Sequence, residues 1–183
     1  MGYQKGVDGM TISLVPLKES SQDIVKTFNR WNNDPEIVHL IRPARSEEEL
    51  TVEHNLTVES LAERLQTHDI FLIYADDRLV GEVNVMYDAA HLYSQEPGSA
   101  WLGLVIGEMV GRGKGVGTYA LTLLEARLRS QGTPRIELGV FAFNEAARHL
   151  YEKLGYVEIA RIKGFTYWNG TFHDDIRMEK RLT

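Results

Sequence analysis

The stretch Trp101–Thr118, WLGLVIGEMVGRGKGVGT, constrains the fold of this chain more than any other. It begins as an almost continuous apolar run, which predicts a strand buried on both faces. It ends in glycines interleaved with Arg112 and Lys114. An amphipathic helix follows, whose apolar side is made by Leu121, Leu124 and Leu128. Glycines let the backbone approach a ligand, and the first N–H groups of a helix lack internal partners and carry partial positive charge. A strand, a glycine-rich turn and a helix in this order predict a site for phosphate or pyrophosphate.

The residues of the turn indicate which phosphate compound is bound. Neither the dinucleotide motif GxGxxG nor the P-loop motif GxxxxGK[ST] is satisfied in register. The hexapeptide RGKGVG, residues 112–117, instead resembles the R/Q-x-x-G-x-G/A motif of the GCN5-related N-acetyltransferases. In that family this turn holds the pyrophosphate of acetyl-coenzyme A. The alternative is a tight connection between a strand and a helix that binds no ligand.

A second stretch strengthens the resemblance. Residues 144–156, NEAARHLYEKLGY, resemble the second cofactor motif of the same family, N-x-x-A-x-x-x-Y-x-x-x-G-F/Y, at every defining position. Asn144 is a good N-cap and Gly155 a good C′ residue, so a helix of about three turns is predicted. Asn144 and Tyr151 are then roughly 10 Å apart along the axis and can face one groove. The alternative for Tyr151 is a half-buried core aromatic.

The resemblance implies a fold and a set of binding residues. The implied fold is α/β, with a mixed, mostly antiparallel sheet of about seven strands flanked by about four helices. Backbone groups of Leu104, Val105 and Ile106 would pair with pantetheine, and one N–H would meet the thioester oxygen. Asn144 would reach the pantetheine arm. The residues implied at the pyrophosphate are Arg112, Gly113, Lys114, Gly115, Val116, Gly117 and Thr118. Residues 107–111 make the turn about one residue longer than expected for the family's branch of ribosomal-protein N-terminal acetyltransferases, which leaves the thioester contact open by one position.

Acetyl transfer to an amine defines the chemical roles that the chain must fill. The attacking ammonium must lose a proton, the oxyanion needs hydrogen-bond donors, and the departing thiolate needs a proton or a donor. The resemblance implies that Tyr151 is the acid near the sulfur. The strand Trp101–Ile106 contains no carboxylate, so the general base is Glu82 on the preceding strand, Glu108, or a water held by the backbone. Glu82 is the preferred side chain, and a plain surface glutamate is the alternative.

Composition sets outer bounds on the function. A length of 183 residues predicts one domain, which we expect to span residues 11–183 after a glycine-rich, flexible leader at 1–10. A formal net charge of −6 argues against nucleic acid and for cationic partners. The chain has no cysteine, which excludes disulfides, Cys-ligated zinc and a cysteine acyl-enzyme. The histidines lack metal-ligand spacing, so no metal is predicted. Without a membrane-spanning apolar run or a signal sequence, the predicted location is the cytoplasm.

The remaining pattern predicts the order β α α β β β α β α β β. The expected strands are 11–17, 70–75, 79–87, 101–106, 136–142, 159–168 and 171–178, the last two joined by a hairpin at Asn169-Gly170. The expected helices are 21–31, 57–68, one from about 116 to 131, and 145–154. Residues 42–56 read as an exposed, mobile segment with a short helical turn. Its acidic run at 47–49 is either a solvated face or part of a lid over the acceptor site.

The acceptor has no motif of its own. The segment WNNDPEIVHLI, residues 31–41, resembles the branch of ribosomal-protein N-terminal acetyltransferases, although Asp-Pro as a helix stop also explains it. Together with the net acidity, this favours a cationic amine, first the α-amino group of a protein N-terminus and then polyamines or aminoglycosides. The protein is expected to be a monomer or homodimer. Two other classes stay open: a module that binds coenzyme A without turnover, and a nucleotide-phosphate enzyme in which Glu108 holds magnesium.

Overall fold

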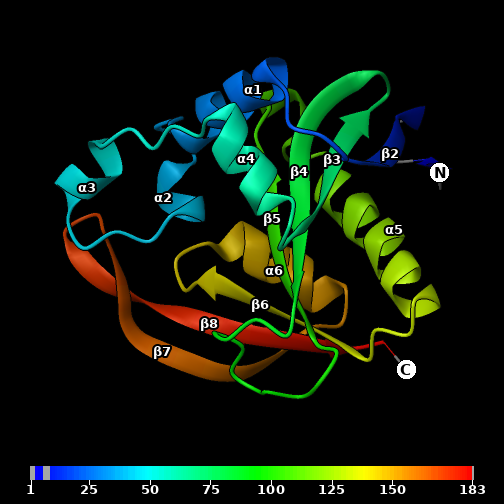
Figure 1. The fold of residues 1–183 in the computed structure, drawn as a ribbon. Helices are drawn as coiled ribbons and strands as arrows, with labels where there is room; N and C mark the ends of the chain where they lie inside the picture. The colour runs from blue at the N-terminus through cyan, green and yellow to red at the C-terminus, as the bar shows by residue number, and fades with distance from the viewer. Residues whose placement is uncertain (1–2, 6–8, 183) are drawn as a thin grey trace.

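The computed structural model describes residues 3–5 and 9–182, and within them eight strands form a single sheet (Figure 1). The strands are β1 (Tyr3–Lys5), β2 (Thr11–Pro16), β3 (Asp69–Ala75), β4 (Arg78–Tyr87), β5 (Ala100–Ile106), β6 (Arg135–Phe141), β7 (Val157–Trp168) and β8 (Thr171–Arg181). The helices are α1 (Gln22–Asn32), α2 (Val38–Ile41), α3 (Glu47–Thr51), α4 (Val58–Arg64), α5 (Val116–Ser130) and α6 (Glu145–Lys153), and a 3₁₀ turn spans Met109–Gly111. None of the helices in these residues has the length and apolarity needed to cross a membrane.

The sheet has the order β1-β2-β3-β4-β5-β6-β8-β7, and every neighbouring pair is antiparallel except β5 and β6. The predicted mixed, mostly antiparallel architecture is therefore confirmed. Strands β2–β8 correspond to the seven predicted strands, and α1, α4, α5 and α6 to the four predicted helices. The sequence did not predict β1, which lies within the expected leader and pairs with β2. The rest of that leader before Gly9, residues 1–2 and 6–8, lies outside the described residues.

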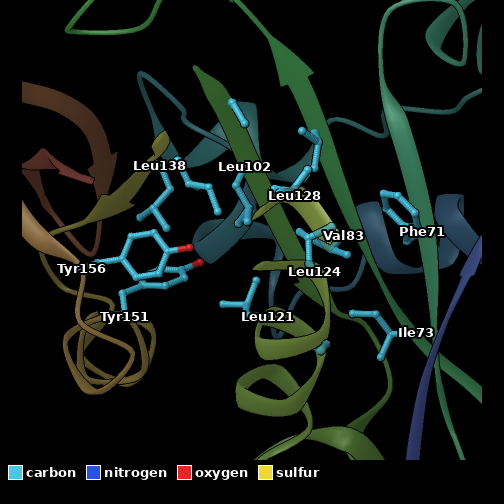
Figure 2. Close-up of a cluster of buried hydrophobic side chains, with 14 of the residues drawn as sticks. Phe71, Ile73, Val83, Leu102, Leu121, Leu124, Leu128, Leu138, Tyr151 and Tyr156 are labelled. Carbon is cyan, nitrogen blue, oxygen red and sulfur yellow. The ribbon is translucent and has the colours of Figure 1, made fainter. Parts of the chain in front are cut away.

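Alternation along the strands distributes the core over both faces of the sheet. On one face α5 and α6 cover a cluster that includes Phe71, Ile73 and Leu138, and Figure 2 shows the leucines of α5 directed toward these strands. On the other face α1 and α4 cover Ile70 and Leu72, which are the alternate residues of β3. The three leucines predicted for the inner side of α5 are at most 1% exposed, so that periodicity is confirmed.

Strands β5 and β6 separate soon after they begin. Their parallel pairing is limited to Ala100 with Ile136 and Trp101 with Glu137, and Figure 1 shows the two strands then diverging. The prediction that Trp101–Ile106 is buried on both faces is therefore wrong for the second half of the strand. Leu102 is buried, but residues 103–106 are only partly buried, because β6 no longer runs beside them.

A buried charge network holds β5 and β6 together at their paired end. Arg135 and Glu137 of β6 form an ion pair with fully buried side chains. Arg135 also donates to the hydroxyl of Ser99 at 3.2 Å, and Glu137 accepts from the backbone N–H of Tyr93 at 2.7 Å. Both partners lie in the connection that leads into β5. Since buried charges persist only when they are paired and hydrogen-bonded, this network anchors one end and leaves the other end of the two strands free to open.

Candidate active site

The glycine-rich turn has the geometry of an anion site. Gly113 and Gly115 have φ values of +70° and +75°, in the left-handed region that side chains disfavour. Gly115 is the N-cap of the 15-residue helix α5, and no side chain caps that helix. The N–H groups of its first turn are therefore available to an anionic ligand. Gly117 allows close packing, because a Cβ there would lie 2.8 Å from the side chain of Leu150 on α6.

The two basic residues of the turn differ in their surroundings. Lys114 is exposed, and within residues 9–182 it has no ion-pair partner. The side chain of Arg112 is instead occupied: it donates to the carbonyls of Ile106 and Gly107 and forms an ion pair with Asp34. Arg112 was predicted as a pyrophosphate ligand, but its guanidinium is already bonded to other residues. Only its backbone could contribute to the anion site.

The second half of β5 offers an unpaired edge next to this turn. On one side β5 pairs with β4 as far as Ile106, opposite Gly81. On the β6 side, in the described residues, no ladder continues beyond Trp101. Within residues 104–106, the backbone groups that alternate toward that edge lack a strand partner, so an extended ligand can supply one.

Helix α6 forms as the second motif predicts. Asn144 is its N-cap and accepts from the backbone N–H of Ala147 at 3.2 Å. Gly155 follows the last turn with φ +89°, and the N–H of Tyr156 bonds to the carbonyl of Tyr151 at 3.0 Å. The N-cap and C′ predictions are confirmed. The side-chain oxygen of Asn144 is engaged in capping, which leaves its amide nitrogen for a ligand.

Tyr151 lies at the centre of the α5–α6 side of the site. It is 6% exposed, and its ring contacts that of Tyr156 edge to face, with centroids 5.7 Å apart. Figure 2 shows both hydroxyls pointing from their rings toward the strand side of the cluster, near Leu102 and Leu138. Burial among apolar side chains raises the pKa of Tyr151 to about 12, so the phenol keeps its proton at neutral pH.

The candidate bases differ sharply in their environment. Glu82 is 6% exposed on β4, directly opposite Val105 of β5. Its Oε1 accepts from Arg64 at 3.1 Å, and its Oε2 is enclosed with no partner among residues 9–182. Desolvation raises the pKa of this carboxyl, although Arg64 opposes the shift. Glu82 is therefore not the surface glutamate of the alternative reading.

Glu108 serves a different purpose. Its Oε1 accepts from Trp31 Nε1 at 2.8 Å and pairs with Arg30 at 2.6 Å. The hydrogen bond from Arg30, which outweighs the opposing effect of desolvation, lowers the pKa of Glu108. A carboxylate held in this way is a poor base and a poor ligand for magnesium. Among the described residues no group of three or more His, Asp or Glu side chains is arranged to hold a metal ion, and the expectation of no metal stays a prediction.

The structure also gathers residues that the sequence reasoning missed. Asp175 of β8 is 3% exposed, with its carboxylate beside Gly139 and bonded to Arg177 at 2.7 Å. Burial raises the pKa of Asp175. Farther along the same side, four aromatic rings form a cluster: His39, Phe143, Trp168 and His173. The alternation of His173, Asp175 and Arg177 along β8 was the available signal, since these residues share one face of a strand.

The chain belongs to the acetyltransferase (GNAT) family, whose model matches residues 28–156. The resemblance found in the two motifs is thereby confirmed. Assignment to the ribosomal-protein branch stays a prediction.

Particular relatives match over a shorter region. The chain is 51% identical over 45 residues to the uncharacterized N-acetyltransferase YdgE of Bacillus subtilis (strain 168), which is 25% of this chain and 29% of that protein. It is 47% identical over 47 residues to YycN of the same organism, 26% of this chain and 30% of that protein. The matched segments therefore cover less than a third of either relative.

Solved structures match over nearly the whole chain. Spermidine N-acetyltransferase from Vibrio cholerae, in complex with CoA and spermine, has a TM-score of 0.71 at 20% identity and covers 93% of this chain and 95% of that chain. Mycobacterium smegmatis RimJ in complex with CoA-disulfide has a TM-score of 0.69 at 20% identity and covers 98% of this chain and 84% of that chain. At this level of identity the likeness establishes the fold.

Proposed function

We propose that this protein is an acetyl-CoA-dependent N-acetyltransferase that transfers the acetyl group directly to a primary amine. The observation that carries the proposal is the separation of β5 from β6 beside the uncapped start of α5. An extended pantetheine arm fits the unpaired edge of β5, and a pyrophosphate fits the helix terminus next to it. The family supports the same reading, since its model matches residues 28–156, which include β5, the turn, α5 and β6.

The residues fit coenzyme A by their chemistry. The turn 112–117 supplies backbone N–H groups and the free ammonium of Lys114, and Thr118 lies in the first turn of α5. Backbone groups at 104–106 would align the pantetheine arm, and one N–H there would donate to the carbonyl oxygen of the thioester. Acetyl-CoA itself supplies an activated acyl group, so the protein needs no covalent nucleophile.

The two candidate catalytic side chains lie on opposite faces of the sheet. Tyr151 belongs to the cluster covered by α5 and α6, whereas Glu82 contacts Arg64 of α4 on the other face. Glu82, with its raised pKa and a free carboxylate oxygen, would take the proton of the incoming ammonium. Tyr151, which remains protonated, would donate to the departing sulfur. In direct transfer the amine adds to the thioester carbonyl and the thiolate then leaves the tetrahedral intermediate, so a base is needed at the amine and a proton donor at the sulfur.

The acceptor is proposed to be a cationic amine. The net charge of the chain is −6, and Glu47, Glu48 and Glu49 lie in the first turn of the exposed helix α3. Negative potential near a cleft concentrates cations. The α-amino group of a protein N-terminus remains the first choice, and polyamines are the second, since structures similar to this one include RimJ and a spermidine acetyltransferase.

Thiol release tests the proposal directly. Purified protein with acetyl-CoA is assayed for free CoA in the presence of N-terminal peptides, spermidine, an aminoglycoside and free amino acids. We expect release that depends on one class of amine, with the acetylated product seen by mass spectrometry. Tight CoA binding without release across the panel would instead indicate the sensing module. Absence of CoA binding by calorimetry would refute the proposal.

A further inference from the structure

The guanidinium of Arg112 connects the cofactor turn to the segment that follows α1. Its Nε donates to the carbonyl of Ile106 at 3.1 Å, and its Nη2 donates to that of Gly107 at 2.7 Å. The same group pairs with Asp34 and with Glu36, each at 3.2 Å. The guanidinium therefore bonds to the end of β5 and to the carboxylates of residues 34 and 36 at the same time. Because the guanidinium is rigid and planar, it fixes the position of these two segments relative to each other.

Asp34 in turn organises the start of α2. Its Oδ1 accepts from the N–H of Glu36 at 2.9 Å, and its carbonyl accepts from the N–H of Val38 at 2.8 Å. The carboxylate of Asp34 is therefore shared between Arg112 and the turn that leads into α2.

A second connection lies immediately beside the first. Trp31, at the end of α1, packs against Gly107 so closely that a Cβ on this glycine would lie 2.1 Å from the indole. The indole also donates to Glu108, which pairs with Arg30. We call residues 31–41 the α1–α2 wall. Its first part is attached to the connection between β5 and α5 by hydrogen bonds, ion pairs and packing.

The far part of the wall reaches the second cofactor motif. His39 of α2 stacks on Trp168 of β7 with centroids 4.6 Å apart and planes 9° from parallel. Trp168 also stacks on Phe143 at 4.7 Å, and Phe143 immediately precedes the N-cap Asn144. The wall thus spans the distance between the two motifs on the face of the sheet that carries Glu82.

We propose that Arg112 is a positioning residue, which transmits occupancy of the coenzyme A site to the α1–α2 wall, and that its side chain is not a pyrophosphate ligand. The inference rests on the proposed coenzyme A site. A pyrophosphate that orders the turn 112–117 restricts Arg112, and through Asp34 and Glu36 it restricts the wall. Coupling of this kind is reciprocal, so an ordered wall also favours cofactor binding.

Arg112 and Lys114 make the inference testable, because the structure assigns them different roles. The variants are Arg112→Gln and Lys114→Gln, with Arg161→Gln as a control, since Arg161 forms a surface pair with Glu158 on β7. Calorimetry with CoA should show affinity reduced about tenfold in Lys114→Gln, typical of the loss of a charged hydrogen bond. In Arg112→Gln the dissociation constant should rise by about threefold at most, because only the contribution of the ordered wall to CoA binding is lost.

Hydrogen exchange then reports on the wall. Saturating CoA should slow amide exchange in residues 34–41 of the wild type, of Lys114→Gln and of Arg161→Gln. In Arg112→Gln, with CoA bound, this slowing should be lost. Asp34→Asn, which leaves Arg112 in place, should lose it as well, and it serves as the second variant if Arg112→Gln does not fold.

The outcomes separate the inference from the proposed function. A wild type that does not bind CoA refutes the site itself. If CoA binds, three results overturn the inference: no slowing at 34–41 in the wild type, slowing that persists in both the Arg112 and Asp34 variants, or an affinity loss in Arg112→Gln equal to that in Lys114→Gln.

Discussion

At the scale of single residues, buried hydroxyl and carboxyl groups distinguish this site from an ordinary core. The phenol of Tyr151 is enclosed by apolar side chains, and Glu82 has an enclosed carboxylate oxygen with no partner in the described part of the chain. Burying polar groups without partners costs free energy. Glu82 Oε2 is kept in that condition, which makes Glu82 a candidate for catalysis, because a raised carboxyl pKa suits a general base.

Tyr151→Phe tests the proposed acid. The ring and its packing are retained while the proton is lost, so kcat should fall roughly 10²- to 10⁴-fold, as is typical for the loss of a general acid. Affinity for acetyl-CoA should change little. Steady-state kinetics and calorimetry provide the measurements, with Tyr156→Phe as the matched control on the neighbouring ring. An unchanged kcat in Tyr151→Phe would show that Tyr151 is a core aromatic without a catalytic role.

Glu82→Gln should separate activity from stability. The folded-state pKa of Glu82 is raised, so its ionisation opposes folding, and stability is lost as pH rises through that pKa. The amide cannot ionise, and Arg64 is partly exposed to water. We therefore expect a higher melting temperature than wild type at pH 7, with the difference shrinking as pH falls toward 4.

The activity of the same variant should move the other way. In the wild type kcat/KM should rise with pH through the raised pKa of Glu82, because only the carboxylate accepts the proton. In Glu82→Gln the rise of kcat/KM with pH should disappear, and kcat/KM should fall about 10²-fold or more. If the variant kept wild-type activity and an unaltered pH profile, Glu82 would not be the general base, and a water held by the backbone would be the remaining candidate.

At the scale of elements, helix α5 has a glycine with positive φ at each end, and only the one at its start belongs to the proposed cofactor turn. Positive φ values occur at Gly115, at the start of α5, and at Gly132, which follows its end. Both positions disfavour a side chain by a similar amount, about 1–2 kcal/mol. Only Gly115 lies where a ligand would approach the helix terminus.

Gly115→Val and Gly132→Val therefore form a matched pair. Both should lower the melting temperature by a few degrees, roughly 2–4 °C per kcal/mol for a chain of this length. Only Gly115→Val should abolish CoA binding in calorimetry, because its side chain fills the space that the phosphate needs. Equal CoA affinity in the two variants would contradict the assignment of the turn.

At the scale of the whole molecule, charge is expected to govern the acceptor. The chain carries a formal charge of −6, and three of its acidic residues are consecutive glutamates on helix α3, which has no buried residue. If this potential attracts cationic amines, kcat/KM for spermidine and for N-terminal peptides should fall as salt increases from about 0.01 to 0.5 M. A neutral amino acid provides the control. Preference for a neutral or anionic acceptor, independent of salt, would refute the cationic class and leave acetyl transfer intact.

Local patterns in the sequence were enough to predict most of the elements and the conformation of the glycine-rich turn. Periodicity predicts β2–β8 and the long helices, and the N-cap at Asn144 and the C′ glycine at Gly155 bound α6 as expected. These features depend on residues a few positions apart, whose physics is short-range. The positive φ values of Gly113 and Gly115 are likewise local features of the sequence.

Only the tertiary structure decided which side chains meet. The edge of β5 is unpaired because its pairing with β6 ends after Trp101. The residues that pair are about 35 positions apart in the sequence. The guanidinium of Arg112 lies in the cofactor motif, but its partners Asp34 and Glu36 are 78 and 76 residues away. The burial of Glu82 likewise depends on Arg64 and α4. Contacts of this kind are set by how the helices pack across the sheet, which spacing along the chain does not specify.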